Sequence, residues 1–258
     1  RGGHLRAILD RWPQITAVAF DQDPTAIAYA KENFATEIQQ NRLQLVHRNF
    51  SEYTVEEFGT FDGMLLDLGV SSPQLDQADR GFSFYHDGPL DMRMNPQKGL
   101  TAADIIATFS EEQLIEIFKS YGEIQRPFRV VRAILADRQT KPFLRTRDLA
   151  GLIERVDGWQ RKGFHPATQY FMALRLVVNQ ELEILEPSLL KLVHGLRPIG
   201  RIAVLTFHSL EDRIVKNTFK EFESLGLPVN KKVIVPSREE ESSNPRSRSA
   251  KLRVFEKF

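Results

Sequence analysis

Short apolar runs that alternate with helical patterns constrain the fold of this chain more than any other feature of its sequence. Residues 15–20 (ITAVAF), 42–47 (RLQLVH) and 61–68 (FDGMLLDL) have the length and the apolar character of strands buried in a parallel sheet. A helical pattern precedes the first run, and another follows it after Asp23, an expected N-cap with Pro24 at the first helical position. This alternation predicts a doubly wound α/β sheet.

The middle of the chain changes to helical patterning. From Ala102 to about Gln160 no strand-like run interrupts the helical spacing, and Ser110 with Gln113 forms an expected capping box. The pattern therefore predicts two domains. A helical domain at residues 99–167 is inserted into a sheet domain made of residues 1–98 and 168–258.

The last third of the chain returns to the pattern of the sheet. A helix is expected after His165, and Pro187 is expected to end or kink it. Residues 199–208 predict a further buried strand. Residues 231–236 and 251–258 predict a closing hairpin, and the polar stretch 237–249 predicts a loop.

Charge is segregated along the chain, although the net charge of the 258 residues is only +1. Residues 50–118 contain 13 acidic and 3 basic residues, whereas residues 119–162 contain 11 basic and 5 acidic ones. Residues 246–253 add four basic residues and no acidic one. Separate basic segments favour a polyanionic partner such as nucleic acid, with solvated helix faces of mixed charge as the alternative.

Composition excludes several classes of site. The chain has no cysteine, which excludes disulfides, thiolate metal sites and cysteine nucleophiles. No apolar stretch approaches the roughly 20 residues of a membrane span, and none has the form of a signal peptide. We therefore expect no membrane partner. The histidines lack the spacing of metal ligands, so we expect no metal site either.

Polar residues and glycines cluster where the expected strands end, and ligands of open α/β sheets bind beyond such ends. Asp21 lies 18 positions after Gly3, a spacing that suits a carboxylate binding a ribose diol beside a glycine turn. Phe50 follows another strand and suits an adenine ring. These features indicate an adenosine cofactor, whereas the alternatives are an ordinary turn acid at Asp21 and a core residue at Phe50.

Residues 65–94 form an unusually long irregular stretch that begins at a strand ending in Asp67. Loops of this length inside a compact domain are commonly functional, and this one is too apolar for a solvated linker. Methylation of a nucleobase amine requires acceptors for its N–H hydrogens and a route for proton loss, which Asp67 and the Ser71–Pro73 turn would supply. Phe82, Phe84 or Tyr85 would stack on an extruded base, unless they pin the loop to the protein instead.

Five motifs in this sequence resemble those of the bacterial small-subunit ribosomal RNA (cytosine-N4)-methyltransferases. They are GGH at 2–4, LLDLGVSSPQLDQADRGFSFYHDGPLDMRM at 65–94, HPAT at 165–168 with the downstream LR..VN.EL, TFHSLEDRIVK at 206–216 and NPRSRSAKLR at 244–253. They run in order over essentially the whole chain. One departure is that the family's usual glycine pair before the late strand reads Pro198-Ile199-Gly200 here.

The resemblance implies a class I methyltransferase fold with an inserted helical domain and S-adenosylmethionine as cofactor. A cytoplasmic enzyme is expected, with the mitochondrial matrix as the alternative compartment. The implied target is the N4 amine of a decoding-site cytidine in small-subunit ribosomal RNA, either as free RNA or in the small ribosomal subunit. The resemblance also implies cofactor contacts at Gly2, Gly3, His4, Asp21, Phe50, Asp67 and Gln74.

Two further sets of residues are expected to act on the RNA. Asp67, Ser72 and Pro73 are the expected catalytic residues, because they would hold the amine beside the methyl donor. Basic side chains of the insertion and of the C-terminal segment are expected to bind phosphates, namely Arg126, Arg129, Arg132, Arg246, Arg248 and Lys251.

Other functions fit parts of the sequence less well. Asp21 would also suit a nicotinamide-dependent dehydrogenase, but the acidic loop offers no site for hydride transfer. His208-Ser209 with Glu211 and Asp212 suggests a hydrolase, but the chain lacks the G-x-S-x-G motif. The alternative from a different class is a non-catalytic RNA-binding module of ribosome assembly with the same fold.

Overall fold

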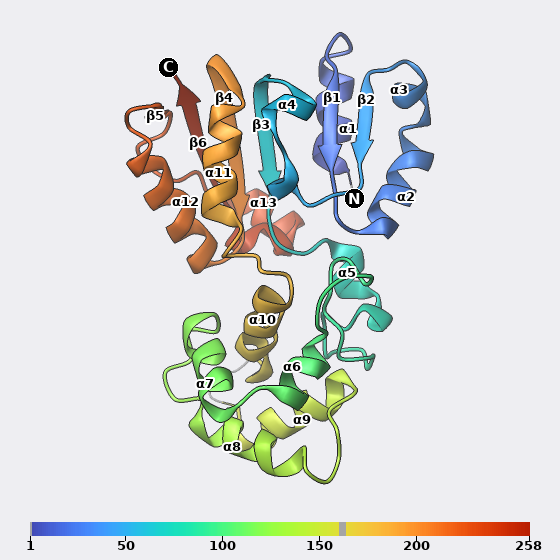
Figure 1. Cartoon of the computed structure of the whole chain (residues 1–258), viewed down its shortest axis with the longest axis vertical. Helices are drawn as coiled ribbons and strands as arrows, with labels where there is room; N and C mark the ends of the chain where they lie inside the picture. Colours follow the sequence, from blue (N-terminus) through green and yellow to red (C-terminus); the bar gives the residue numbers. More distant parts are fainter. Residues whose placement is uncertain (1, 160–163) are drawn as a thin grey trace. The chain divides into compact units, whose positions relative to one another are not determined.

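The computed structural model, drawn in Figure 1, describes residues 2–159 and 164–258. Its contacts divide the chain into two units. The first unit comprises Arg1–Arg48 and Val70–Gln180. The second unit comprises Asn49–Gly69 and Glu181–Phe258. None of the described helices is both long and apolar enough to cross a membrane.

The first unit begins with a small α/β layer. Its elements are α1 (Gly3–Arg11), β1 (Ala17–Phe20), α2 (Pro24–Asn33), α3 (Ala35–Gln39) and β2 (Leu43–Val46). β1 and β2 pair in parallel, with Ala17 opposite Leu43 and Phe20 opposite Val46. Buried Leu9, Phe34 and Leu43 hold the helices to this layer. Both predicted strands are confirmed, whereas α3 was not predicted.

α2 begins where the sequence predicts. The side chain of Asp23 accepts a hydrogen bond from the Thr25 backbone N–H at 2.9 Å, and Pro24 is the first helical residue. Proline is favoured there because its missing N–H has no partner in the first turn of a helix.

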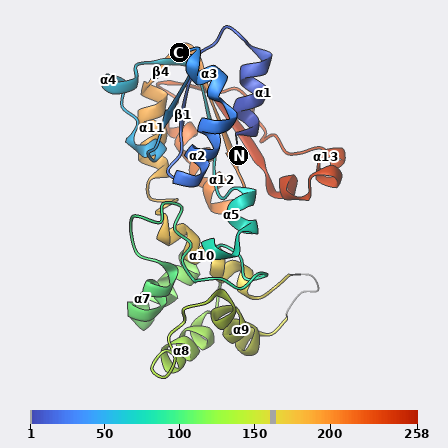
Figure 2. The same ribbon diagram turned by 90° about the vertical axis from the view of Figure 1, so that its right-hand side faces the viewer.

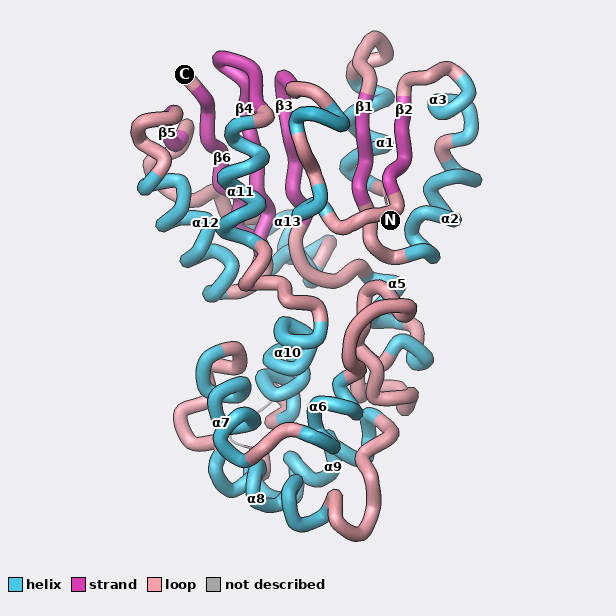
Figure 3. Tube along the Cα trace, viewed as in Figure 1, coloured by secondary structure: helices cyan, strands magenta, loops and turns pink. Residues whose placement is uncertain are grey.

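The long stretch after β3 is only partly irregular. It forms α5 (Ser72–Asp76) and the short 3₁₀ helix η2 (Ala78–Arg80), so the prediction of irregular structure is wrong for these residues. Ser71 and Gln74 form a capping box at the start of α5, a local signal that the sequence interpretation missed. Residues 81–101 contain neither helix nor strand, as the long pink segment between α5 and α6 in Figure 3 shows.

Five helices share one apolar core in the first unit: α6 (Ala102–Thr108), α7 (Glu111–Ser120), α8 (Phe128–Asp137), α9 (Thr146–Asp157) and α10 (Ala167–Val178). The described part of residues 102–160 contains no strand, and the predicted capping box of Ser110 and Gln113 is present. α10 packs with α6, α7 and α9. The helical cluster therefore includes a helix that lies almost entirely beyond residue 167, and the domain boundaries given above stay a prediction.

Pro187 does not end or kink a helix, contrary to the prediction. α10 ends at Val178, a run of turns follows, and α11 (Leu185–His194) begins two residues before Pro187. Backbone N–H groups in the first turn of a helix have no intrahelical acceptor, so Pro187, which lacks an N–H, is tolerated there. The chain turns instead at Gln180, which has a positive φ of 52°.

The second unit contains a four-stranded sheet in the order β3-β4-β6-β5. Its strands are β3 (Phe61–Asp67), β4 (Leu196–Thr206), β5 (Gly226–Pro228) and β6 (Lys251–Lys257). β3 and β4 are parallel, whereas β6 is antiparallel to both β4 and β5. α11 and α12 (Ser209–Glu221) pack together against this sheet. Two short elements, η1 (Phe50–Glu52) and α4 (Val55–Phe58), precede β3.

Two predictions near the C-terminus are wrong in part. Residues 231–236 contribute one isolated bridge, Ile234 to Leu252, because β4 and β5 pair with β6 along most of its length. The predicted loop at 237–249 forms α13 (Arg238–Ser243) and η3 (Pro245–Ser249) instead, with the Ser237 side chain as N-cap. Figure 2 shows α13 on the opposite side of the sheet from α11.

β4 carries an irregularity near its start. Phe61 pairs with Leu196, but Gly63 already pairs with Arg201, so the β4 segment between these positions bulges out of the ladder. Ile199 lies in this bulge with a φ of 65° and 75% of its surface exposed. A branched side chain therefore occupies a left-handed backbone position that favours glycine.

Candidate functional site

The predicted cofactor residues of the first unit lie at α1 and at the end of β1. Gly2, Gly3 and His4 are exposed at the start of α1. Gly2 has a φ of 68°, and a Cβ atom there would lie 2.9 Å from the Phe34 ring. Only glycine therefore fits at this position. Because Gly2 has no side chain, its backbone is accessible to a ligand.

Asp21 follows β1 directly and keeps an exposed surface. Its Oδ1 atom accepts a hydrogen bond from the Asp23 backbone N–H at 2.8 Å. Surrounding protein partly desolvates the carboxyl group and raises its pKa above the ordinary 3.8, although the Asp23 N–H favours the charged form. The carboxylate at this strand end is thus available as an acceptor for a ligand hydroxyl.

A buried polar cluster connects β1 to α5 and η2. Asp23 is 2% exposed, and its Oδ2 atom accepts hydrogen bonds from Gln74 Nε2 at 2.9 Å and from Arg80 Nη1 at 2.7 Å. Burial would raise the pKa of Asp23, but the hydrogen bonds from Thr25 and Arg80 outweigh it and lower the pKa. The Gln74 Oε1 atom accepts from the Ser71 backbone N–H at 2.8 Å. Gln74 therefore holds the Ser71–Pro73 turn to the end of β1.

Arg80 and Asn179 anchor the irregular loop. Arg80 Nη2 donates to the backbone oxygens of Arg93 and Met94 at 3.1 and 3.0 Å. Asn179 donates to the Met92 oxygen at 2.8 Å and accepts from the Met94 N–H at 2.7 Å. Met92 is fully buried with a φ of 66°, an unfavourable conformation that these contacts hold in place.

The three loop aromatics differ in exposure. Phe82 is 7% exposed and belongs to the helical core. Phe84 is half-buried and packs edge-on against Phe171, with ring centroids 4.8 Å apart. Tyr85 is 66% exposed. The faces of Phe82 and Phe84 are thus largely used inside the protein, whereas most of Tyr85 is open to solvent.

Asp67 and Phe50 belong to the second unit. Asp67 is the last residue of β3 and is exposed, opposite Leu205 of β4. Phe50 begins η1 and is half-buried. Asn49 caps this turn in a capping box with Glu52. Both predicted contacts therefore retain accessible surface in their own unit.

The predicted RNA-binding residues form one group in each unit. Arg126, Arg129 and Arg132 are exposed around the start of α8, and Arg132 lies 3.3 Å from Glu111. In the second unit Arg246 and Arg248 are exposed in η3. Lys251 forms an ion pair with Asp212 at 3.2 Å, so part of its charge is already compensated.

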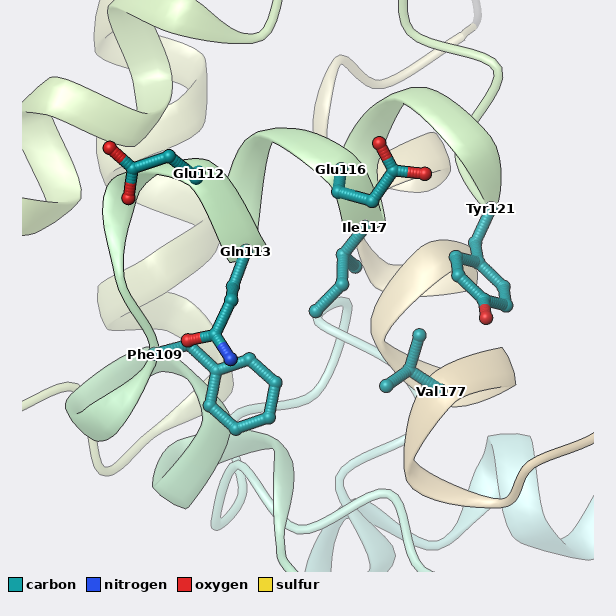
Figure 4. Close-up of a pocket in the computed structure, with 7 residues that line it drawn as sticks. All are labelled: Phe109, Glu112, Gln113, Glu116, Ile117, Tyr121 and Val177. Atoms are coloured by element: carbon teal, nitrogen blue, oxygen red, sulfur yellow. The ribbon is translucent and has the colours of Figure 1, made fainter.

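The helical part of the first unit has a shallow surface hollow. It has a volume of about 500 Å³ and is lined by α7 residues that include Glu112, Glu116 and Ile117, and by Val177 of α10 (Figure 4). None of the predicted site residues lines it. Residues 2–159 and 164–258 also contain no group of three or more His, Asp or Glu side chains that could hold a metal ion.

Sequence reasoning missed the residues that support the site. Asp23 was assigned only as a helix cap, and Arg80 and Asn179 were not assigned at all. The hydrogen bonds that join Asp23 to Gln74 and Arg80, and Asn179 to Met94, connect residues more than fifty positions apart, so no local pattern reveals them. The one local signal was the Ser71–Gln74 capping box, which marks a fixed turn that contains the proposed catalytic residues Ser72 and Pro73.

Comparison with known proteins decides the family. The whole sequence, residues 1–258, matches the profile of the MraW methylase family. The chain belongs to this family. The family predicted from the motifs and the predicted α/β fold of the class I methyltransferase type are thus both confirmed.

Three curated relatives of this MraW methylase family member are each named ribosomal RNA small subunit methyltransferase H. The chain is 61% identical to the protein from Bdellovibrio bacteriovorus over 257 residues, which is 100% of the chain and 78% of the relative. It is 46% identical to the Crocosphaera subtropica protein, covering 100% and 80%, and 44% identical to the Shewanella denitrificans protein, covering 100% and 89%.

The residues of the first unit fit the methyl donor that a methylase family implies. S-adenosylmethionine carries a ribose diol, for which the exposed Asp21 carboxylate is a suitable acceptor. The bare backbone at Gly2 permits close approach, since Phe34 leaves no room for a side chain there. The donor set is therefore compatible with an adenosine-containing sulfonium.

Proposed function

We propose that this chain transfers a methyl group from S-adenosylmethionine to the exocyclic N4 amine of a decoding-site cytidine in small-subunit ribosomal RNA, in the cytoplasm. The observation that carries this proposal is the match of the whole chain to the MraW methylase family, together with relatives named as small-subunit ribosomal RNA methyltransferases. The motif GVSSPQ after Asp67 supports the amine as the target.

The cofactor contacts in the proposal are those given by the family motifs. Asp21 accepts hydrogen bonds from the ribose, and Gly2, Gly3 and His4 present backbone and a polar side chain at the start of α1. Phe50 and Asp67 contribute from the second unit. Gln74 is also one of the proposed cofactor residues. Both the oxygen and the nitrogen of its amide bind other protein groups, so we propose that it acts by holding the turn in place.

For the proposed methyl transfer, the protein has to orient the target amine and provide a route for its proton. S-adenosylmethionine supplies a methyl group on a positively charged sulfur, an already activated donor. Asp67 accepts one N–H of the amine, and the backbone turn at Ser72 and Pro73 accepts the other. The amine lone pair is then aligned for attack, and the exposed Asp67 carboxylate provides a route for the proton.

Tyr85 and the basic groups complete the proposed RNA site. Tyr85 stacks on the extruded cytosine, because Phe82 and Phe84 are largely occupied inside the protein. The arginines near α8 and those of η3 bind phosphates, with Lys251 contributing less because of its ion pair with Asp212.

Labelled S-adenosylmethionine and small ribosomal subunits test the proposal, with the modified base mapped afterwards. The wild-type protein should methylate one cytidine at N4. Asp67→Ala should lose at least about 100-fold in turnover while its thermal unfolding stays unchanged. Asp62→Asn is the matched control, since Asp62 lies exposed on the same strand, where it forms an ion pair with Arg197 at 2.9 Å.

Two results would contradict the proposal. Methylation at a position other than N4 would refute the target. RNA binding without any methyl transfer by the wild-type protein would instead support the non-catalytic assembly module. Full activity of Asp67→Ala would remove Asp67 from the chemistry without changing the family assignment.

A further inference from the structure

A buried histidine and glutamate lie at the start of α12, directly after β4. Glu211 is 1% exposed, and the side chain of His208 is 10% exposed. His208 Nε2 lies 3.2 Å from Glu211 Oε1. Neither residue has a part in the proposed chemistry, so their burial calls for a separate explanation.

These two residues close a small ring of contacts around Phe207. The Phe207 backbone N–H donates to Glu211 Oε2 at 3.0 Å. The Glu211 backbone N–H points to His208 Nδ1 at 3.4 Å, so His208 is the N-cap of α12. Glu211 therefore holds the Phe207 backbone N–H, and His208 holds both the side chain and the backbone N–H of Glu211.

Helix capping alone does not account for this arrangement. Serine, threonine, aspartate and asparagine are the preferred N-caps, and histidine is not among them. A glutamate is rarely fully buried, because removing its carboxyl group from water is costly unless it is paired. A simple cap would need neither a histidine nor a buried carboxylate.

The ring adjoins the segment that follows Asp67. The Leu68 N–H donates to the Leu205 oxygen at 3.0 Å, which continues the pairing of β3 with β4. A Cβ atom at Gly69 would lie 3.8 Å from Cδ2 of Phe207, at van der Waals contact distance. The Phe207 ring therefore lies beside the backbone two residues after Asp67, separated from it by the space that a Cβ atom would fill.

We propose that His208 and Glu211 are positioning residues that hold Phe207 against Gly69 and thereby fix the direction of the Asp67 carboxylate. The proposal deepens the proposed function, on which its catalytic consequence rests. Asp67 is the last residue of β3, so the path of the backbone directly after it contributes to the direction of its side chain. A displacement of about 1 Å at a reacting group can cost about 100-fold in rate.

His208→Asn and Glu211→Gln test this role, because asparagine still caps a helix and glutamine still accepts one N–H. We expect turnover to fall roughly 10- to 100-fold for His208→Asn and less for Glu211→Gln, with KM for S-adenosylmethionine within about twofold of the wild-type value. Hydrogen exchange of residues 67–70, followed by mass spectrometry, should become faster in His208→Asn.

Val215→Ala is the matched control, since Val215 is fully buried in the same helix. It should lower the thermal stability of the protein without changing turnover or the exchange of residues 67–70. The proposal is overturned if His208→Asn keeps wild-type turnover, or if turnover falls while exchange at 67–70 stays as in Val215→Ala. If Asp67→Asn kept full activity while exchange became faster in His208→Asn, the role of Asp67 in the proposed chemistry would be wrong. The structural role of His208 in holding the backbone at residues 67–70 would still stand, so the two claims fail separately.

Discussion

Gln74 and Asp23 join the two halves of the first unit's candidate site through one buried hydrogen bond of 2.9 Å. Asp23 begins the helix after the cofactor strand, whereas Gln74 belongs to the turn proposed to receive the target amine. Because Arg80 binds the same carboxylate oxygen at 2.7 Å, the cluster also connects to the loop that carries Tyr85. Stability and function of this unit should therefore depend on one carboxylate.

Asp23→Asn should lower the free energy of unfolding by about 3–5 kcal/mol, measured by urea denaturation at pH 7. Asparagine keeps the helix cap, but its amide group would face the donors of Gln74 and Arg80, and Arg80 would lose its charged partner. Asp79→Asn is the control, because Asp79 is exposed nearby and should change stability by no more than about 0.5 kcal/mol.

The Asp23 carboxylate should also make the stability of the folded protein depend on pH in the acid range. The pKa of Asp23 in the folded protein lies below its ordinary value of 3.8. Its contribution to stability is therefore complete above the ordinary pKa and is lost as pH falls through the lower, folded-state pKa. Unfolding measured from pH 6 downward should show this loss in the wild-type protein and a smaller one in Asp23→Asn. Equal acid sensitivity of the two proteins would contradict the assignment.

Gly2→Ala should destabilise the protein by about 1–2 kcal/mol and weaken binding of S-adenosylmethionine, measured by calorimetry. The reasons are the left-handed backbone at Gly2 and the Phe34 ring 2.9 Å from any added Cβ. Gly3→Ala is a closely matched control, since nothing lies within 4 Å of a Cβ there and Gly3 is helical. Equal effects of the two substitutions would refute the explanation.

Ile199→Gly should stabilise the protein by about 1 kcal/mol, although it removes a large apolar side chain. Ile199 is 75% exposed, so little burial is lost, and glycine relieves the positive φ of 65° in the bulge of β4. Thermal unfolding measures the effect, and Leu190→Gly at an exposed position of α11 should have the opposite sign. A lower melting temperature for Ile199→Gly would mean that its side chain packs more than its exposure indicates.

Tyr85→Ala should reduce the affinity for RNA by roughly 5- to 150-fold, the equivalent of one stacked base at about 1–3 kcal/mol. Its stability should remain within about 0.5 kcal/mol of the wild type, because Tyr85 is mostly exposed. Phe82→Ala should instead cost about 3–5 kcal/mol of stability. Tyr85→Phe keeps the ring and should retain binding. Loss of binding in Tyr85→Phe would point to the hydroxyl group.

Replacement of Arg126, Arg129 and Arg132 by glutamine should flatten the salt dependence of RNA binding. Every arginine that no longer neutralises a phosphate should reduce the slope of log K against log salt by about 0.7–0.9. Lys251→Gln should have a smaller effect, since Lys251 is paired with Asp212. Filter binding at several salt concentrations measures both, and an unchanged slope in the triple variant would place the phosphate-binding residues elsewhere.

Local patterns predicted the strands and caps well. Asp23, Pro24 and Ser110 mark helix starts through contacts within three residues, which a sequence displays directly. Pro187 was misjudged because its effect depends on where the helix begins, and the partners of β6 were misjudged because pairing is decided across the fold. Short segments such as α3, β5 and α13 depend on packing and carried no strong periodic signal.

In the candidate site, too, some features follow from local sequence and others depend on packing between distant segments. The strand ends at Asp21 and Asp67 follow from the pattern of buried runs. The difference between Phe82 and Tyr85 does not, because both are aromatic residues of one loop and only the helical core decides which is covered. Likewise, the pairing of Asp23 with Arg80 spans 57 positions and leaves no trace in local spacing.

The loop backbone crosses itself at a distance that admits no side chain. A Cβ at Gly88 would lie 1.6 Å from the Ala78 oxygen, and one at Gly81 would lie 2.2 Å from the Pro89 oxygen. Grafting part of this segment from another enzyme would break these crossings, so attempts to redirect substrate choice must exchange the segment between Ala78 and Pro89 as one cassette or leave it intact.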